Sequence, residues 1–169
     1  MPDSMKLGDW LTQQPFGLTM SSGFFGFFAH GGVLQALLEA GCQPARVSGS
    51  SAGALVTGLW ASGTSIEQIK ERFFGAQRAE FWDPGLGFGL LRGAKFRQML
   101  DDLLTVKDFE HCPVPSAVSV YDILRLETVA IGEGDMINPI YASCCVPLMF
   151  HPARIAGRSY WDGGILDRP

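Results

Sequence analysis

The pattern of apolar and polar residues predicts two strand–turn–helix units at the start of the chain. Short apolar runs over 16–21 and 45–50 are typical of buried strands, and both run into serine and glycine. Apolar residues then recur at helical spacing over 30–40 and over 51–62. This repeated order is typical of a parallel sheet in an α/β fold.

The remaining pattern extends this fold without a visible interdomain linker. We expect helices over 65–74, 94–104 and 136–146, and strands over 114–123, 126–134 and 153–161, the last of these either a single strand or a hairpin. The glycine-rich, apolar segment 83–93 is a candidate lid over a cleft, or else an ordinary surface loop. Residues 1–169 are therefore expected to form one domain, a three-layer sandwich around a central, mostly parallel sheet.

Composition and charge narrow the functional classes. The net charge is −4 and no basic cluster occurs, which argues against a nucleic-acid partner. The four cysteines lack metal-ligand spacing and are expected to be buried thiols in a reducing compartment. The N-terminus lacks the apolar core of a signal peptide, and the uncharged stretch 11–38 is broken by polar residues and glycines. We expect a cytoplasmic protein.

The segment Gly49-Ser50-Ser51-Ala52-Gly53 matches the Gly-x-Ser-x-Gly pattern of a nucleophile elbow. A serine on a sharp strand-to-helix turn needs small neighbours, and each flanking residue here is Gly, Ser or Ala. The turn also places Ser51 at a helix N-terminus, where free N–H groups favour a developing oxyanion. The alternative is a tight turn of small residues without chemistry.

A nucleophilic serine needs a general base, and the residues leave two choices. Asp122 and His151 follow Ser51 in the order of a Ser–Asp–His triad. Asp162, in the sequence Trp-Asp-Gly-Gly, is the stronger candidate because two glycines permit a sharp, accessible turn. An aspartate that only caps this turn is the structural alternative.

The order of four segments resembles the patatin-like phospholipase family over nearly the whole chain. These segments are LTMSSGFFGFFAHGGVLQALLEAG, VSGSSAGAL, YASCCVPLMFHP and YWDGG. The resemblance implies a lipid acyl hydrolase that works through an acyl-serine, with Ser51 as nucleophile and Asp162 as general base. Gly49, Gly53, Gly163 and Gly164 are then motif glycines, and no metal or cofactor is required.

The resemblance also implies an oxyanion hole. Its donors would be the backbone N–H groups of Gly23, Phe24 and Phe25, together with Ala52 after the nucleophile. In this chain Gly26 stands where the family's loop has an arginine. The phenylalanines of this loop could hold an acyl chain, although we expect each one to be core packing, with at least one of them lining the site.

Three functional hypotheses follow from these residues. The first is a phospholipase- or lysophospholipase-like ester hydrolase with a lipid substrate and peripheral membrane contact. The second is a catalytically silent relative that binds acyl chains or a partner protein. The third is a Ser–His esterase that uses His151. Patatin-like domains usually continue beyond the Asp-Gly-Gly motif, so we also expect either a domain truncated at its C-terminus or a homo-oligomer that completes the sheet.

Overall fold

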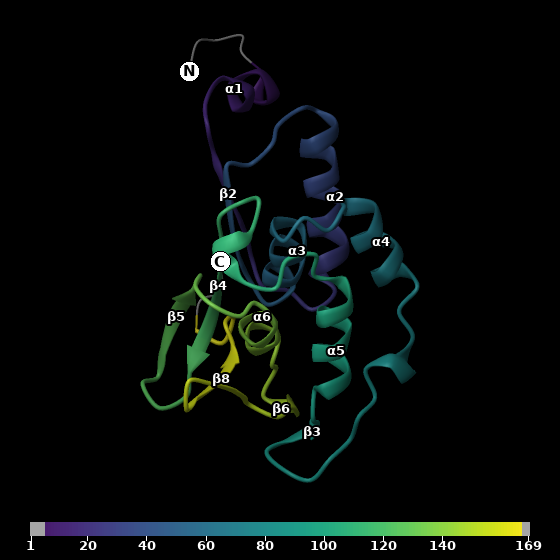
Figure 1. The fold of residues 1–169 in the computed structure, drawn as a ribbon, viewed down its shortest axis with the longest axis vertical. Helices are drawn as coiled ribbons and strands as arrows, with labels where there is room; N and C mark the ends of the chain where they lie inside the picture. Colours follow the sequence, from purple (N-terminus) through teal and green to yellow (C-terminus); the bar gives the residue numbers. More distant parts are fainter. Residues whose placement is uncertain (1–5, 167–169) are drawn as a thin grey trace.

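The computed structural model describes residues 6–166, which form a mixed α/β fold (Figure 1). The helices are α1 (Leu7–Gln13), α2 (Gly26–Glu39), α3 (Ala52–Ala61), α4 (Ile66–Phe74), α5 (Ala94–Leu103) and α6 (Ile137–Ser143), with 3-10 turns η1 (Arg78–Glu80) and η2 (Phe109–His111). The strands are β1 (Gly17–Met20), β2 (Arg46–Ser50), β3 (Gly89–Leu91), β4 (Ser116–Asp122), β5 (Glu127–Ile131), β6 (Leu148–Phe150), β7 (Ala153–Ile155) and β8 (Arg158–Asp162).

The main sheet is organised around β4. β1, β2 and β4 are parallel neighbours, while β5 and β8 run antiparallel to β4, and β7 pairs antiparallel with β8. β2 and β8 share one edge of β4: β2 pairs with 116–119 and β8 with 120–122, whereas β5 takes the other edge. The C-terminal ends of β2 and β8 therefore meet on consecutive residues of β4.

Helices cover the sheet and enclose the core. α3 contacts β1, β2 and β4, and α6 contacts β4, β7 and β8. Nearly every residue of α3 is buried, because α2 and α4 cover the side that faces away from the sheet. A helix that is apolar all round needs such an environment. The predicted α/β class, with a central sheet flanked by helices, is confirmed.

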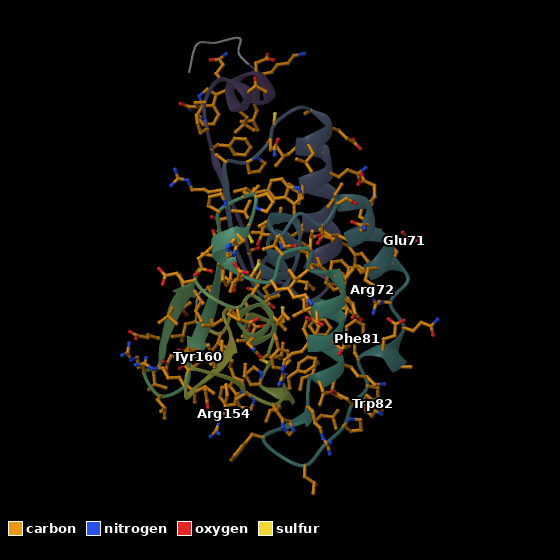
Figure 2. All side chains as sticks on the ribbon, viewed as in Figure 1. Glu71, Arg72, Phe81, Trp82, Arg154 and Tyr160 are labelled. Atoms are coloured by element: carbon orange, nitrogen blue, oxygen red, sulfur yellow. The ribbon has the colours of Figure 1, made fainter. Side chains whose placement is uncertain are left out.

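Strand β8 shows how alternation selects the buried side chains. Tyr160 and Asp162 are buried and the residues between and before them are only partly buried, as the period of two requires. Tyr160 is labelled on β8 in Figure 2, beside Arg154 of the neighbouring strand β7, whose side chain is exposed. Because Asp162 pairs with Val120, which is fully buried, both side chains lie on the core side of the sheet.

Most predicted elements are confirmed within a few residues, and the differences are local. α2 begins at Gly26, four residues before the predicted start, because Phe25 adopts a left-handed conformation with φ 63° and turns the chain into the helix. The short elements α1, β3 and β6 were not predicted. The segment 83–93 contains β3, which pairs in parallel with β6. Ser65 caps α4 through a reciprocal capping box with Gln68.

Two motif glycines let α3 approach the sheet backbone. A Cβ on Gly53 would lie 2.2 Å from the carbonyl oxygen of Met20 in β1. A Cβ on Gly49 would lie 2.3 Å from the carbonyl carbon of Gly53 itself. Glycine is therefore required at both positions because the first turn of α3 lies directly against β1 and β2.

We expect Gly53→Ala to lower the free energy of unfolding by about 1–3 kcal/mol, because the added methyl overpacks against backbone. The matched control is Gly32→Ala on α2, where a Cβ would meet nothing within 4 Å. In this helix interior alanine should stabilise by about 0.5–1 kcal/mol. Urea unfolding measures both changes, and equal stability of Gly53→Ala and the parent protein would contradict the close approach.

Candidate functional site

Ser51 lies on a strained turn between β2 and α3. It is the N-cap residue of α3, with φ 51° and ψ −117°. A positive φ is uncommon for a residue other than glycine and costs about 1–3 kcal/mol in such sparsely populated regions. A sharp, strained turn of this kind between a strand and a helix is typical of a nucleophile elbow, in which it exposes the serine hydroxyl.

The Ser51 hydroxyl donates a hydrogen bond to Asp162. The distance from Ser51 Oγ to Asp162 Oδ2 is 2.7 Å. The second carboxylate oxygen, Oδ1, accepts the backbone N–H of Gly164 at 2.8 Å, so the turn after β8 holds the carboxylate in place. Gly163 also lies against β4, since a Cβ there would be 2.2 Å from the carbonyl oxygen of Ser119. The register of β4 brings these residues together across the sheet.

Burial sets the protonation behaviour of Asp162. Its side chain is 6% exposed, and this desolvation raises the pKa of the carboxyl above its ordinary value. The hydrogen bonds from the Ser51 hydroxyl and the Gly164 amide lower the pKa but do not cancel the effect of burial. A carboxylate with a raised pKa is a stronger base than one in water.

Ser143 connects the two turns that carry Ser51 and Asp162. Its side chain is fully buried at the end of α6, and its Oγ accepts the backbone N–H of Ser51 at 2.8 Å. Its carbonyl oxygen accepts the backbone N–H of Gly163 at 3.3 Å. One residue thus anchors the elbow through its side chain and the Asp-Gly-Gly turn through its backbone. The quoted segment YASCCVPLMFHP contains Ser143, but no sequence signal indicated this double contact.

The four residues predicted for an oxyanion hole lie beside Ser51. Gly23, Phe24, Phe25 and Ala52 line a cavity of about 140 Å³ that reaches Ser51 and continues toward the core at Phe96 and Phe150. Within residues 6–166, the backbone N–H groups of Gly23, Phe24 and Phe25 donate to no acceptor. A wider cavity of about 480 Å³ opens above Ser51 and Asp162, between Phe24 and the segment Val146–Pro147.

The expectation that each loop phenylalanine is core packing was wrong for three of them. Phe24, Phe25 and Phe28 are 69%, 64% and 39% exposed, whereas Phe27 packs against the core. Phe24 and Phe25 lie in the turn before α2, and in the first turn of the helix only Phe27 is on the side that packs against the core. The expectation that at least one of these rings lines the site is confirmed by Phe24.

His151 and Asp122 lie in other environments. His151 lies against Gly87, and its backbone is hydrogen-bonded to Leu91 and Tyr141.

Asp122 lies two residues beyond Val120 on β4. Its carboxylate accepts the backbone N–H groups of Leu124 and Arg125 and forms an ion pair with Arg158 at 3.3 Å. Burial works to raise the pKa of Asp122, but these donors outweigh it and hold the pKa below its usual value. Among residues 6–166, the structure joins Ser51 to neither of them by a hydrogen bond.

Within 6–166, no group of three or more His, Cys, Asp or Glu side chains could hold a metal ion. No helix of this part of the chain combines the length and the hydropathy that a membrane span requires.

Comparison with known proteins identifies the family. The profile described as patatin-like phospholipase matches residues 18–169, so the chain belongs to this family. An uncharacterized NTE family protein of Mycobacterium tuberculosis is 33% identical over 153 residues, which is 89% of this chain and 42% of that protein. The neuropathy target esterase sws of Drosophila persimilis is 37% identical over 142 residues, or 84% of this chain and 9% of that protein. The chain thus spans less than half the length of these relatives.

A solved structure supports the fold. The crystal structure of VipD from Legionella pneumophila superposes with a TM-score of 0.73 over 90% of this chain and 46% of that one. The sequences are 21% identical, so this likeness concerns the arrangement of helices and strands alone.

We expect Ser143→Ala to lower the free energy of unfolding by about 1–3 kcal/mol, because the partly buried N–H of Ser51 loses its acceptor. The matched control is Ser119→Ala, whose hydroxyl makes only a long contact of 3.5 Å to Gly49 O and is partly exposed. Urea unfolding of both variants tests the difference. Equal losses of unfolding free energy in the two variants would contradict a specific stabilising role of the Ser143 hydrogen bond.

Asp162→Asn should raise the melting temperature at neutral pH. A folded-state pKa above the unfolded value means that this group's contribution to stability is present at low pH and is lost as pH rises through the folded pKa. The neutral amide avoids that loss, so its advantage should vanish in acid. Asp122→Asn is the control, and it should lower the melting temperature at neutral pH. The lowered pKa of Asp122 means that its carboxylate stabilises the folded state above the unfolded pKa. Thermal unfolding across acid and neutral pH would contradict us if both variants shifted alike.

Proposed function

We propose that this protein hydrolyses carboxylic esters of lipids through an acyl-enzyme on Ser51, with Asp162 as the general base. The observation that carries the proposal is the 2.7 Å hydrogen bond from Ser51 Oγ to a buried carboxylate whose pKa is raised. Membership in the patatin-like phospholipase family supports lipid esters as the substrate class. The family resemblance and the geometry thus point to the same two residues.

The first half of the reaction forms the acyl-enzyme. Asp162 Oδ2 takes the hydroxyl proton as Ser51 Oγ attacks the ester carbonyl. The resulting oxyanion would accept the free N–H groups of the loop 23–25 and of Ala52 at the start of α3. Collapse of the tetrahedral intermediate breaks the bond to the alcohol, which receives the proton from Asp162.

The second half regenerates the enzyme. Asp162 takes a proton from water, whose oxygen attacks the acyl carbonyl, and returns it to Ser51 Oγ as the fatty acid leaves. Ser143 would hold the elbow and the Asp-Gly-Gly turn in register through both halves. No metal or cofactor takes part in these steps.

The cavities favour a substrate with an uncharged acyl group. The cavity of about 480 Å³ is within the usual range for small-molecule sites, about 300–1,000 Å³. Among the described residues that line it, Asp162 is the only Asp, Glu, Lys or Arg, and the described lining of the inner cavity toward Phe96 has none. We infer single-chain lipid esters, such as lysophospholipids, as the first class to screen.

Treatment with a long-chain fluorophosphonate, followed by peptide mapping, tests the nucleophile. We expect one adduct on Ser51, and none in Ser51→Ala. In Asp162→Asn the rate of labelling should fall by about 10²–10⁴-fold, the usual contribution of a general base. Ser50→Ala is the control, because the neighbouring hydroxyl makes no hydrogen bond among the described residues and should not affect labelling.

Turnover of a lysophospholipid by the same variants separates the three hypotheses. Loss of turnover in both Ser51→Ala and Asp162→Asn supports the proposal. A folded parent protein that takes no adduct would favour the silent relative that binds acyl chains. Activity that survives Asp162→Asn but not His151→Ala would favour the Ser–His esterase.

A further inference from the structure

A continuous strip of phenylalanine rings leads from the cavity at Ser51 onto the surface. Ring centroids are 4.8 Å apart for Phe24 and Phe25, 4.3 Å for Phe27 and Phe28, and 4.9 Å for Phe28 and Phe74. Phe25 and Phe27 link the two halves at 6.2 Å. We call these five residues the aromatic strip. Large exposed apolar surfaces of this kind mark sites of interaction with proteins or membranes.

The opposite side of the cavity mouth is apolar as well. Val146 and Pro147 line the cavity, and the next residue, Leu148, is 84% exposed. Leu148 has φ 69°, so the chain adopts a left-handed conformation at the start of β6. The mouth therefore has exposed apolar side chains on both flanks, from two segments that are far apart in sequence.

These flanks carry no charge. The segments 21–28 and 144–150 contain no Asp, Glu, Lys or Arg. On α4, the helix that ends at Phe74, Arg72 pairs with Glu80 of η1. The protein as a whole carries a net charge of −4. An uncharged, ring-rich rim complements hydrocarbon and neutral headgroups rather than an anionic surface.

We propose that the aromatic strip and Leu148 dock this protein on the surface of an electrically neutral lipid bilayer, with the mouth of the Ser51 cavity facing the lipid. This inference rests on the proposed function, because the substrate must pass from a lipid phase to Ser51. The continuity of the strip with the cavity favours a bilayer over a protein partner. Phe24 lines both the cavity and the strip, so an acyl chain can move from the bilayer to Ser51 along apolar side chains.

Binding to phosphatidylcholine vesicles tests the proposal without requiring turnover. The experiment uses the Ser51→Ala protein, in which the docking surface is intact. A triple variant adds Phe28→Gln, Phe74→Gln and Leu148→Gln, none of which lines a cavity at Ser51. The control is Leu7→Gln on α1, at the opposite end of the molecule, where the leucine is 65% exposed (Figure 1). Phe74→Gln alone serves as a milder second variant.

We expect the triple variant to bind vesicles at least about tenfold more weakly, since each apolar side chain that leaves water contributes to partitioning. The Leu7→Gln control should bind as the Ser51→Ala parent does. Addition of phosphatidylserine should not strengthen binding, because the segments 21–28 and 144–150 contain no Lys or Arg. In the Ser51-containing background, the triple change should reduce hydrolysis of vesicle lipid but leave hydrolysis of a water-soluble short-chain ester within about twofold.

Each other outcome overturns the docking proposal. Equal vesicle binding by the triple variant and its parent would mean that this surface does not face lipid. Absence of binding by a protein that fluorophosphonate labels at Ser51 would leave the proposed function intact and remove the docking. Self-association that the triple variant abolishes, measured by sedimentation velocity without vesicles, would assign the surface to a second copy of the chain.

Discussion

Strand β4 is the constraint on which the arrangement of this site depends. β2 and β8 approach it from opposite directions along the same edge, and their last residues pair with Ser119 and Val120. Ser51 follows the first of these strands directly, and Asp162 ends the second. A hydrogen bond between side chains 111 residues apart is therefore a consequence of strand register. A shift of β8 by one residue would turn Asp162 to the other face of the sheet.

Two features of the site lower the stability of the folded protein, and buried contacts keep both in place. Ser51 has a strained backbone, and Asp162 is a carboxyl group removed from water. Ser143 supplies an acceptor to the strained turn, and Gly164 supplies a donor to the carboxylate. Nearly every residue of α3 is buried, and this packing holds the first turn of the helix against β1. Local strain that the surrounding packing holds in place is typical of functional sites, because reactive side chains must be kept in particular conformations and away from water.

The cavity at Ser51 contains a charged side chain, whereas the surface around its mouth is apolar. Among the described residues that line the cavity, the one charged side chain is the proposed base, while both flanks of the mouth are apolar. Gly26 begins α2 and lies beside Ala52, since a Cβ there would be 3.6 Å from the Ala52 Cβ. The chain belongs to the patatin-like phospholipase family, and its loop 23–25 carries no charged side chain.

The sequence by itself determined the elements that depend on local chemistry. Periodic apolar residues located most helices and strands, and small residues around Ser51 indicated the elbow, because both signals lie within a few neighbouring positions. Asp162 could be named from two glycines and a family resemblance. Only the tertiary structure decided that Ser143 ties both turns, that Asp122 is held by Arg158, and that Phe24, Phe25 and Phe28 face outward. These outcomes depend on strand register and on where α2 begins, which are set by contacts between residues far apart in the chain.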